Sequence, residues 1–409
     1  MRIFFITSEF IDAKTRKVVD GGLANYLYKI TRELAKNGHD IHVVLPYQKG
    51  ERNILFEGNV HVHFLKPPKN IKYHLKKLAG KLASQNFQQF KKDYVAGALY
   101  KFLEAEHLKK PIDIVQLASL IPWAPLPANI PYCVRISSYA KLYVNAYGYK
   151  DDAKVEDESI LFRKSRFVFG PAQHINEYIC KDLSLPHKFE VIETPCPDDW
   201  PIEDESVYLS LRERIQSAPY LLFFGTIGRL KGSDEIAEII HQFLERYKEI
   251  YFVLAGRKMT WGGAGYCYDG VEHIKASAKE HAGRVIHIPP QPHTSLYPLI
   301  RNAKAIVLPS RIDNFPNACV EAMRLKKAVL GTRGAGGFEQ LLDDGHSGFL
   351  AAAENSPSLL EALNRLMQTS DEQLRVIGEN AYVRTQALAP DIIVKKLLDY
   401  YRYVIQNRE

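Results

Sequence analysis

Cysteine is scarce in this chain, and its spacing carries no metal-binding or disulfide signature. The 409 residues include five cysteines, an odd number, with no C-x-x-C pair and no His/Cys cluster at zinc-finger spacing. The pattern therefore argues against a disulfide scaffold and against a zinc finger. We expect reduced thiols, most simply in the core, at Cys133, Cys180, Cys196, Cys267 and Cys319.

Long hydrophobic runs are missing as well. Apolar runs such as I-F-F-I at 3–6 and L-L-F-F at 221–224 are short, whereas a helix that spans a bilayer needs about 20 residues. Near the N-terminus Glu9 follows a very short apolar run, unlike the apolar region of a secretory signal. We expect a cytoplasmic protein that begins in a buried strand.

What is present is ordinary globular composition. The chain is 46% apolar and 25% charged, with a formal net charge of +7. At about 100–200 residues per domain, this length predicts two or three domains with full cores. A mostly disordered protein is excluded.

The first half alternates strand and helix patterns. A short apolar strand near the N-terminus is followed by the Gly21-Gly22 turn, a helix with apolar Leu23, Leu27 and Ile30, and a second strand, which together form one βαβ unit. Further apolar runs repeat the pattern up to residue 193. We therefore expect an α/β domain over residues 1–200.

A break at 194–206, with three prolines and an acidic cluster, separates this half from a second series of strands and helices. We expect a second doubly wound domain over 201–390 and a closing helix in 391–409 that packs back toward the first domain. Two such domains would face each other across a cleft. The loops at 20–22, 225–232 and 309–317 should converge there, because ligands bind at the carboxyl ends of parallel strands.

The most informative segment is P-S-R-I-D-N-F-P-N-A-C-V-E-A-M at 309–323. A strand ends at Pro309, a polar loop carries Asp313 and Asn314, and Glu321 follows on a helix. Free backbone N–H groups and the positive end of the helix dipole point out of such a junction, which suits a phosphate.

A second motif, F-F-G-T-I-G-R-L-K-G at 223–232, ends a strand with Gly225 and places two cations, Arg229 and Lys231, in the following loop. Fixed cations lower the barrier for a departing diphosphate. The Gly21-Gly22 pair after the first strand lets the backbone approach a ligand closely.

As a block, these segments resemble the retaining glycosyltransferases of GT-B fold in glycosyltransferase family 4, also called glycosyl transferases group 1. The resemblance runs from the GG loop through the G-R-L-K-G loop to G-F-E-Q-L-L and D-G-H-S-G-F-L in the second half. It implies two Rossmann-like, doubly wound parallel-sheet domains. The first domain would bind the acceptor, and the second would bind a nucleoside diphosphate sugar.

The resemblance also implies roles for single residues. Glu321 would accept hydrogen bonds from the ribose hydroxyls, and Asp313, where the family more often has Glu, would hold hydroxyls of the donor sugar. Lys231 and Arg229 would stabilise the leaving diphosphate, although Thr226 stands where the family commonly has Arg. Further donor contacts are implied at Gly21, Gly22, Gly225, Asn314, Phe315, Pro316, Asn317 and Glu339.

One position departs from the family. After the strand that ends in C-V-R-I, the family often carries a His that contacts the donor sugar, but this chain has Ser137 and Ser138. No His occurs between 108 and 173. Either Ser137 or Arg135 is then the candidate for the polar contact, with a turn or cap role for Ser137 as the alternative.

The positive charge is concentrated in one stretch. Residues 66–110 contain eleven lysines against three carboxylates, interleaved with apolar residues. Peripheral contact with an anionic membrane, on its inner face, and a merely solvated helical face both fit this pattern. Nucleic acid is disfavoured, because no recognition motif accompanies the charge.

The resulting interpretation is a hexosyl- or related glycosyltransferase that passes sugar from a nucleoside diphosphate sugar to a glycan or lipid-linked glycan, with retention, in bacterial cell-surface polysaccharide synthesis. No D-x-D triplet is present to hold a diphosphate-bound metal, so we expect no metal and no cofactor. A GT-B sugar-nucleotide epimerase and a weakly active donor-binding subunit remain alternatives.

Overall fold

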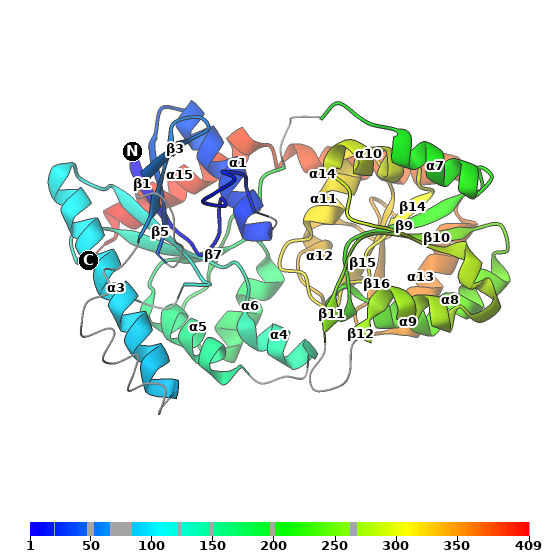
Figure 1. Ribbon diagram of the computed structural model, residues 1–409, viewed down its shortest axis with the longest axis horizontal. Helices are drawn as coiled ribbons and strands as arrows, with labels where there is room; N and C mark the ends of the chain where they lie inside the picture. Colours follow the sequence, from blue (N-terminus) through cyan, green and yellow to red (C-terminus); the bar gives the residue numbers. More distant parts are fainter. Residues whose placement is uncertain are drawn as a thin grey trace.

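The computed structural model of the chain describes residues 1–19, 21–46, 53–65, 84–121, 124–147, 151–196, 201–261 and 268–408. Two sheets lie side by side along the longest axis of the molecule (Figure 1). We refer to the part built on the sheet nearer the N-terminus as the first domain, and to the part built on the other sheet as the second domain.

The first-domain sheet has the strand order β3-β4-β2-β1-β5-β6-β7-β8, and every neighbouring pair is parallel except β3 with β4. All five residues of β1, R-I-F-F-I, are buried, as expected for a parallel strand covered on both faces. The strands are β1 (Arg2–Ile6), β2 (Asp40–Leu45), β3 (Asn53–Phe56), β4 (Val60–Phe64), β5 (Ile114–Ala118), β6 (Tyr132–Arg135), β7 (Val168–Gly170) and β8 (Glu190–Val191).

The second-domain sheet has the order β13-β10-β9-β14-β15-β16 and is parallel throughout, beside a short antiparallel pair, β11 with β12. Two parallel, doubly wound sheets confirm the predicted fold class. The strands are β9 (Tyr220–Ile227), β10 (Tyr251–Lys258), β11 (Thr260–Trp261), β12 (Tyr268–Asp269), β13 (Val285–Ile288), β14 (Ala305–Val307), β15 (Val329–Arg333) and β16 (Phe349–Ala352).

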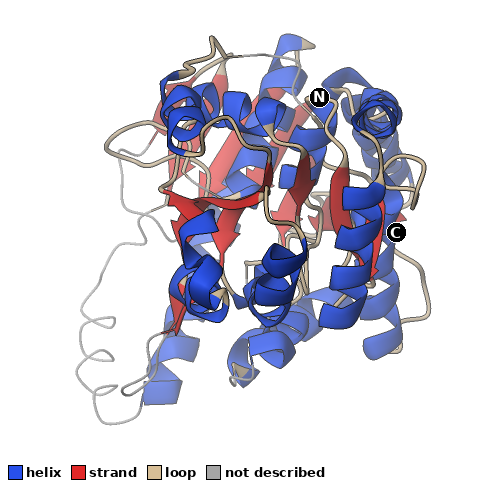
Figure 2. Cartoon of the chain, turned by 90° about the vertical axis from the view of Figure 1, so that its right-hand side faces the viewer, coloured by secondary structure: helices blue, strands red, loops and turns tan. Residues whose placement is uncertain are grey.

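Helices flank the strands of both sheets (Figure 2). In the first domain they are α1 (Gly22–Lys36), α3 (Ser84–Lys109), α4 (Ala140–Tyr147), α5 (Asp152–Lys164) and α6 (Gln173–Asp182). In the second domain they are α7 (Ser206–Arg214), η1 (Arg229–Lys231), α8 (Ser233–Arg246), α9 (Gly270–Ser277), η2 (Lys279–Arg284), α10 (His293–Asn302), α11 (Asn317–Arg324), α12 (Phe338–Leu341), α13 (Ser356–Gln368) and α14 (Asp371–Gln386).

The last helix, α15 (Pro390–Gln406), crosses back to the first domain and packs on α1 (Figure 1). Its buried Tyr401 donates a hydrogen bond to Gln116 of β5 at 2.6 Å. Close by, the buried carboxylate of Glu193 accepts from Arg384 of α14 and from Lys396 of α15. The C-terminal residues therefore tie the two domains together.

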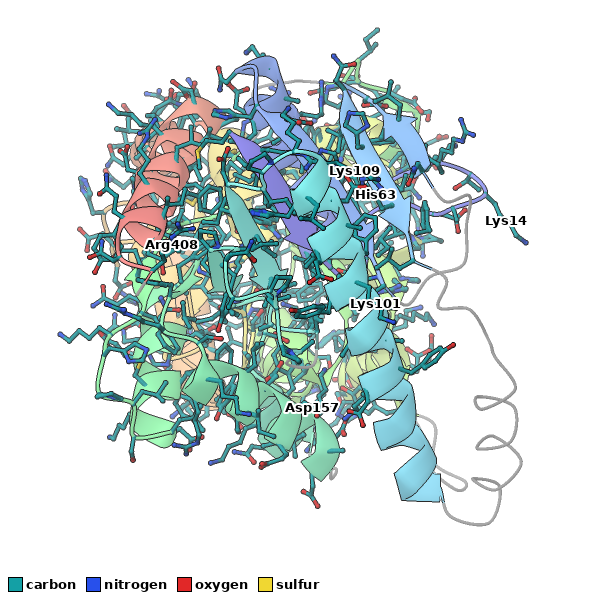
Figure 3. The ribbon with its side chains drawn as sticks, turned by 90° about the vertical axis from the view of Figure 1, so that its left-hand side faces the viewer. Lys14, His63, Lys101, Lys109, Asp157 and Arg408 are labelled. Carbon is teal, nitrogen blue, oxygen red and sulfur yellow. The ribbon has the colours of Figure 1, made fainter. Side chains whose placement is uncertain are left out.

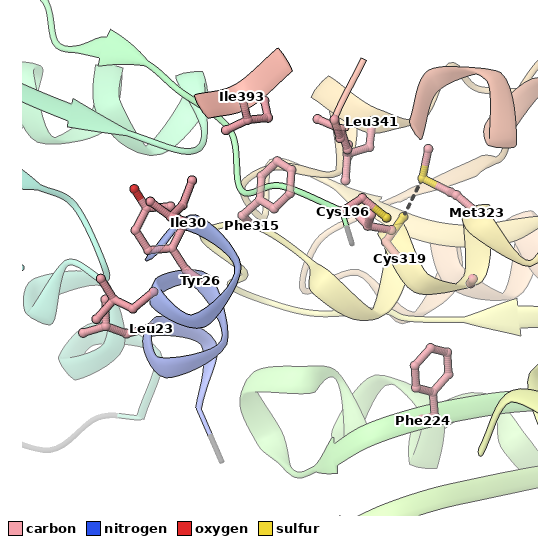
Figure 4. Packing of buried hydrophobic residues seen from close by; sticks show 14 of the residues in the cluster. Leu23, Tyr26, Ile30, Cys196, Phe224, Phe315, Cys319, Met323, Leu341 and Ile393 are labelled. Atoms are coloured by element: carbon pink, nitrogen blue, oxygen red, sulfur yellow. Dashed lines mark hydrogen bonds between the residues drawn. The ribbon is translucent and has the colours of Figure 1, made fainter. Parts of the chain in front are cut away.

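One buried apolar cluster runs through both domains. It includes Tyr26 and Ile30 of α1, Phe315 and Cys319 of the second domain, and Ile393 of α15 (Figure 4). Four of the cysteines are free thiols, three of them buried, while Cys267 lies outside the described residues. No helix within the described ranges is long and apolar enough to cross a bilayer.

Candidate functional site

A cavity of about 380 Å³ lies between the two domains, at the carboxyl ends of the strands. Its lining follows β1, β5, β6 and β7 on one side and β9 and β14 on the other, which is the edge where parallel α/β sheets bind ligands. The polar and glycine lining from the first domain is Glu9, Gly22, Arg135, Ser137, Tyr143 and Thr194. From the second domain it is Gly225, Thr226, Lys231, Ser310, Asp313, Asn314 and Asn317.

The centre of the second-domain wall is an ion pair between the two predicted motifs. Lys231 Nζ donates to Asp313 Oδ2 at 2.5 Å, and neither side chain is fully buried, with exposed fractions of 33% and 18%. The structure thus brings together a cation and a carboxylate that are 82 positions apart in the chain.

Two glycines make this meeting possible. Gly232 has a φ of 85°, and a Cβ there would lie 2.0 Å from the carbonyl oxygen of Pro309. Gly336 has a φ of 136°, and its Cβ would lie 1.9 Å from the carbonyl oxygen of Asp313. Because both positions combine left-handed backbone with backbone contact, only glycine fits them.

Arg229, the other cation of the motif, is turned away from the cavity. Its Nε lies 2.9 Å from Asp234 Oδ2 at the start of α8, and its side chain is 48% exposed. Asp234 also binds Arg311 at 3.2 Å. Of the two predicted diphosphate cations, the structure therefore places Lys231 on the cavity and Arg229 in a surface ion pair.

The loop at 313–317 reaches the first domain. Asn314 is buried, and its Nδ2 donates to the carbonyl oxygens of Ser137 at 3.1 Å and Ile136 at 3.4 Å. Asn317 begins α11 and lines the cavity together with Phe315. Pro316, which precedes the helix, does not line it. Asn314 is thus a bridge between the domains as well as part of the wall.

Both residues considered in place of the missing His line the cavity. The Ser137 hydroxyl is buried and has no hydrogen-bond partner among the described residues. The Arg135 guanidinium is buried 3.5 Å from the centre of the Tyr26 ring and donates to the Thr194 hydroxyl at 3.2 Å. Within the described ranges no carboxylate pairs with Arg135, and burial lowers the pKa of its guanidinium.

Glu9 is a cavity residue that the sequence motifs did not reveal. Its half-buried carboxylate accepts hydrogen bonds from the backbone N–H groups of Leu23 and Ala24 at the start of α1, while burial raises its pKa. A Cβ at Gly21 would lie 2.7 Å from Glu9 Oε1. Gly21 therefore makes room for Glu9, and Gly22 lines the cavity. The available signal was a carboxylate three residues after a buried first strand.

Two predicted carboxylates lie outside the cavity lining. Glu321, on the second turn of α11, is 24% exposed and lies 3.8 Å from His293 of α10. Desolvation by the surrounding protein raises its pKa, with an opposing effect from His293 and from Lys29 of α1. Glu339 accepts the backbone N–H of Gly334 at 2.8 Å and closes its own loop.

Comparison with known proteins gives two matches along the chain. The family described as "Glycosyl transferases group 1" matches residues 212–384, and the "Starch synthase catalytic domain" matches residues 2–113. A D-inositol 3-phosphate glycosyltransferase from Corynebacterium urealyticum is 25% identical over 191 residues, which is 46% of this chain and 43% of that protein. The chain thus matches less than half the length of this relative.

Solved structures resemble the whole fold. Sucrose-phosphate synthase from Thermosynechococcus elongatus has a TM-score of 0.73 at 16% identity, with 99% of both chains covered. Anabaena HepE in complex with UDP-glucose has a TM-score of 0.65 at 16% identity, with 98% of both covered. WaaG, a glycosyltransferase involved in lipopolysaccharide biosynthesis, has a TM-score of 0.63 at 16% identity, with 97% of this chain and 98% of that chain covered.

These matches agree with the two-domain architecture and with the motifs that line the cavity. The second domain carries the group 1 sequence pattern, and the whole chain aligns with enzymes of GT-B fold. Residues 212–384 match the group 1 glycosyltransferases, and the fold of the whole chain is the GT-B fold of these enzymes.

Proposed function

We propose that this protein transfers a sugar from a nucleoside diphosphate sugar to a hydroxyl of a glycan or glycolipid, with retention and without a metal ion. The observation that carries the proposal is the cavity between the domains, where Lys231 and Asp313 meet at the carboxyl edges of two doubly wound sheets. Each domain contributes one wall, as a reaction between a donor and an acceptor requires.

Lys231 is the group that we assign to the leaving diphosphate. Negative charge develops on the diphosphate as the bond to the sugar breaks, and a fixed cation beside it stabilises the transition state. In the structure the ammonium is paired with Asp313. Donor binding would replace that carboxylate by diphosphate oxygens and leave Asp313 free to accept hydrogen bonds from the hydroxyls of the sugar.

The nucleoside is assigned to the side of α11. Glu321 lies outside the cavity lining but keeps a quarter of its side chain exposed, next to His293. A carboxylate there can accept hydrogen bonds from both ribose hydroxyls. The resemblance and the placement on α11, the helix that also carries Asn317 at the cavity, support this role.

The first-domain wall is assigned to the acceptor. Glu9 offers a carboxylate held by the amides of α1. Ser137, whose hydroxyl has no hydrogen-bond partner among the described residues, remains the candidate for contact with the donor sugar. A carboxylate on this wall favours a neutral, hydroxyl-rich acceptor over a phosphorylated one, because like charges repel in a partly buried cleft.

Retention, metal independence and the product class rest on the family resemblance and the motifs. The absence of a D-x-D triplet from the sequence supports transfer without a metal. The similarity in fold to HepE with UDP-glucose and to WaaG supports a nucleotide-sugar donor and a bacterial surface polysaccharide. We propose that the enzyme acts in the synthesis of such a polysaccharide.

Contact with an anionic membrane through residues 66–110 is part of the same proposal. Residues 66–83 lie outside the described residues. On α3, Lys92 pairs with Asp157 and Lys109 with Glu106, while Lys101 is exposed (Figure 3). Lys110, directly after the helix, pairs with Asp40. Because three of these lysines are already paired, most of the attraction to lipid would come from outside α3.

A donor panel tests the proposal. Calorimetric titration with UDP-, GDP- and ADP-sugars should identify one donor, and transfer to a glycan acceptor should proceed in EDTA with retention detected by NMR. Release of a changed sugar nucleotide without an acceptor would instead show an epimerase. Donor binding with no turnover on any acceptor would show a binding subunit.

Binding to lipid vesicles tests the membrane contact. Equal, negligible binding to anionic and neutral vesicles would contradict it.

A further inference from the structure

A second group of reactive side chains lies in the second domain, away from the cleft. His241 and Glu245 are one helical turn apart on α8, and Glu280 and His281 are neighbours in η2, which leads into β13. None of the four lines the cavity between the domains. The role that we assign to the cleft leaves this cluster without a function.

The ligand atoms of the cluster lie close together. His241 Nε2 is 3.1 Å from Glu280 Oε1, and His281 Nε2 is 3.9 Å from the same oxygen. Both nitrogens and a Glu280 oxygen lie within 4.8 Å of one another. The two imidazole rings lie side by side, with centres 5.4 Å apart and an interplanar angle of 30°.

These separations fit one ion at the centre of the group. Zinc binds imidazole nitrogen and carboxylate oxygen at about 2.0–2.2 Å, and a tetrahedral arrangement then places neighbouring ligand atoms roughly 3.3 Å apart. The observed distances of 3.1 and 3.9 Å lie on either side of that value. Small rotations of the side chains would therefore bring these three ligand atoms to binding distance from one ion.

A fourth ligand is available on α8. Glu245 Oε2 lies 2.7 Å from His281 Nε2, in an ion pair that a bound metal would replace. Glu245 and Glu280 are 58% and 62% exposed, while His281 and His241 are 16% and 33% exposed. Ion pairs with one exposed partner are screened by solvent and add little to stability. Breaking these pairs to coordinate an ion therefore costs little.

We propose that His241, Glu280 and His281 bind a zinc ion or another late first-row dication, with Glu245 as the fourth ligand. Two imidazoles with two carboxylates suit these metals, whereas magnesium and calcium prefer all-oxygen shells. The ion would join α8 to the segment before β13, far from the reacting groups. It is a structural site and leaves transfer in the cleft metal-independent.

Metal titration of the full-length chain tests the site. We expect one equivalent of Zn²⁺ to bind, and Co²⁺ in its place to give the visible absorption of a tetrahedral complex. The variant His241→Ala/His281→Ala should lose affinity by more than the roughly 10–100-fold that loss of an outer-shell partner costs. Binding should weaken from pH 7.5 to pH 5.5, because protons compete for the imidazoles.

The controls separate this site from adventitious binding. His174→Ala, an exposed histidine of α6 in the first domain, should bind Zn²⁺ like the unaltered chain. Zn²⁺ should raise the unfolding temperature of that control but not of the double variant, and circular dichroism without metal should show both variants folded. Equal Zn²⁺ affinity in the double variant and the unaltered chain, or no tetrahedral Co²⁺ spectrum, would overturn the proposal.

Discussion

The two domains build their walls of the cleft in different ways. The second-domain wall consists of two short loops, each held by a glycine with positive φ, that bring Lys231 against Asp313. The first-domain wall collects single side chains from different strand ends, such as Glu9, Arg135 and Thr194. The residues of a contiguous loop can be recognised in the sequence as a motif. Residues scattered over several strand ends leave no such pattern in the sequence.

The domains also differ in their buried titratable groups. In the first domain His42 and His63 are buried and joined by a 2.9 Å hydrogen bond, with Asp40 and Asn53 at the two ends of the chain of bonds. The second domain has its paired histidines, His241 and His281, at the surface. Protonation of the buried pair is therefore coupled to unfolding of the first domain.

The largest expected effect is the loss of stability in acid that the buried pair His42 and His63 causes. Burial lowers the pKa of both His42 and His63 to about 4, below the usual 6.5 of the unfolded chain. The unfolded state therefore binds more protons as the pH falls below 6.5, and folding becomes less favourable. Between pH 6.5 and pH 5 we expect a loss of about 1.5 kcal/mol per histidine in the free energy of unfolding, measured by urea denaturation.

The double variant His42→Phe/His63→Phe provides the control. Phenylalanine keeps the aromatic stacking, in which Phe4 lies 4.3 Å from His42, and removes the titration. Its stability should change far less over the same pH range. An unchanged acid dependence in this variant would show that other groups control the acid response.

The second-largest effect is expected when Lys231, the cation that lines the cavity, is removed. Lys231→Ala should lower kcat by roughly 10²–10³, the cost of one lost transition-state contact. Arg229→Ala is the matched control, because it removes a cation from the same loop that is paired with Asp234 outside the cavity. Steady-state kinetics with the donor from the panel would decide. Equal losses in both variants would contradict the assignment of Lys231 alone to the diphosphate.

Substitution of one glycine tests how the second-domain wall is held in place. Gly336→Ala combines a φ of 136° with a Cβ at 1.9 Å from the Asp313 carbonyl oxygen, so we expect a cost of about 3 kcal/mol. Gly334→Ala also meets a positive φ but has open space around it, and should cost about 1 kcal/mol. Chemical denaturation measures both. Similar losses of stability in the two variants would mean that the loop that carries Asp313 can move to accommodate a side chain at position 336.

The smallest effect is expected on the first-domain wall. Glu9→Gln keeps an oxygen for the amides of α1 and removes the charge. We expect the acceptor KM to rise about fivefold with the donor KM unchanged, because exchanging a hydrogen bond to a charged group for one to a neutral group costs about 1 kcal/mol. Glu339→Gln is the control, since that carboxylate binds a backbone amide outside the cavity. A rise in the donor KM alone would move Glu9 to the donor side.

Much of the fold was predictable from local pattern. The apolar runs that became β1 and β9, the turn at Gly21-Gly22 and the final helix all follow from hydrophobic periodicity and chain breakers. The resemblance to the group 1 glycosyltransferases was recognisable from the 309–323 and 223–232 segments, and the family match over residues 212–384 confirms it for the second domain. The orientation of a side chain that leaves a loop is not encoded in such a pattern.

The candidate site shows that limit at particular residues. Arg229 and Lys231 are two positions apart and chemically alike, yet Asp234 holds one at the surface while Asp313 holds the other in the cleft. Glu9 stood in no motif, because its partners are the amides of α1 and its place in the cavity depends on the packing of β1. Arg135 was one of two open candidates, and the structure places both on the cavity.

The sequence by itself determined two α/β domains, their order and the two loops of the second-domain wall, because periodicity, chain breakers and glycine requirements act over a few neighbouring residues. Only the tertiary structure decided which of two cations faces the cleft, which side chains complete the first-domain wall, and that His241 meets His281. Those outcomes depend on contacts between distant segments, which form only when the sheets and helices pack.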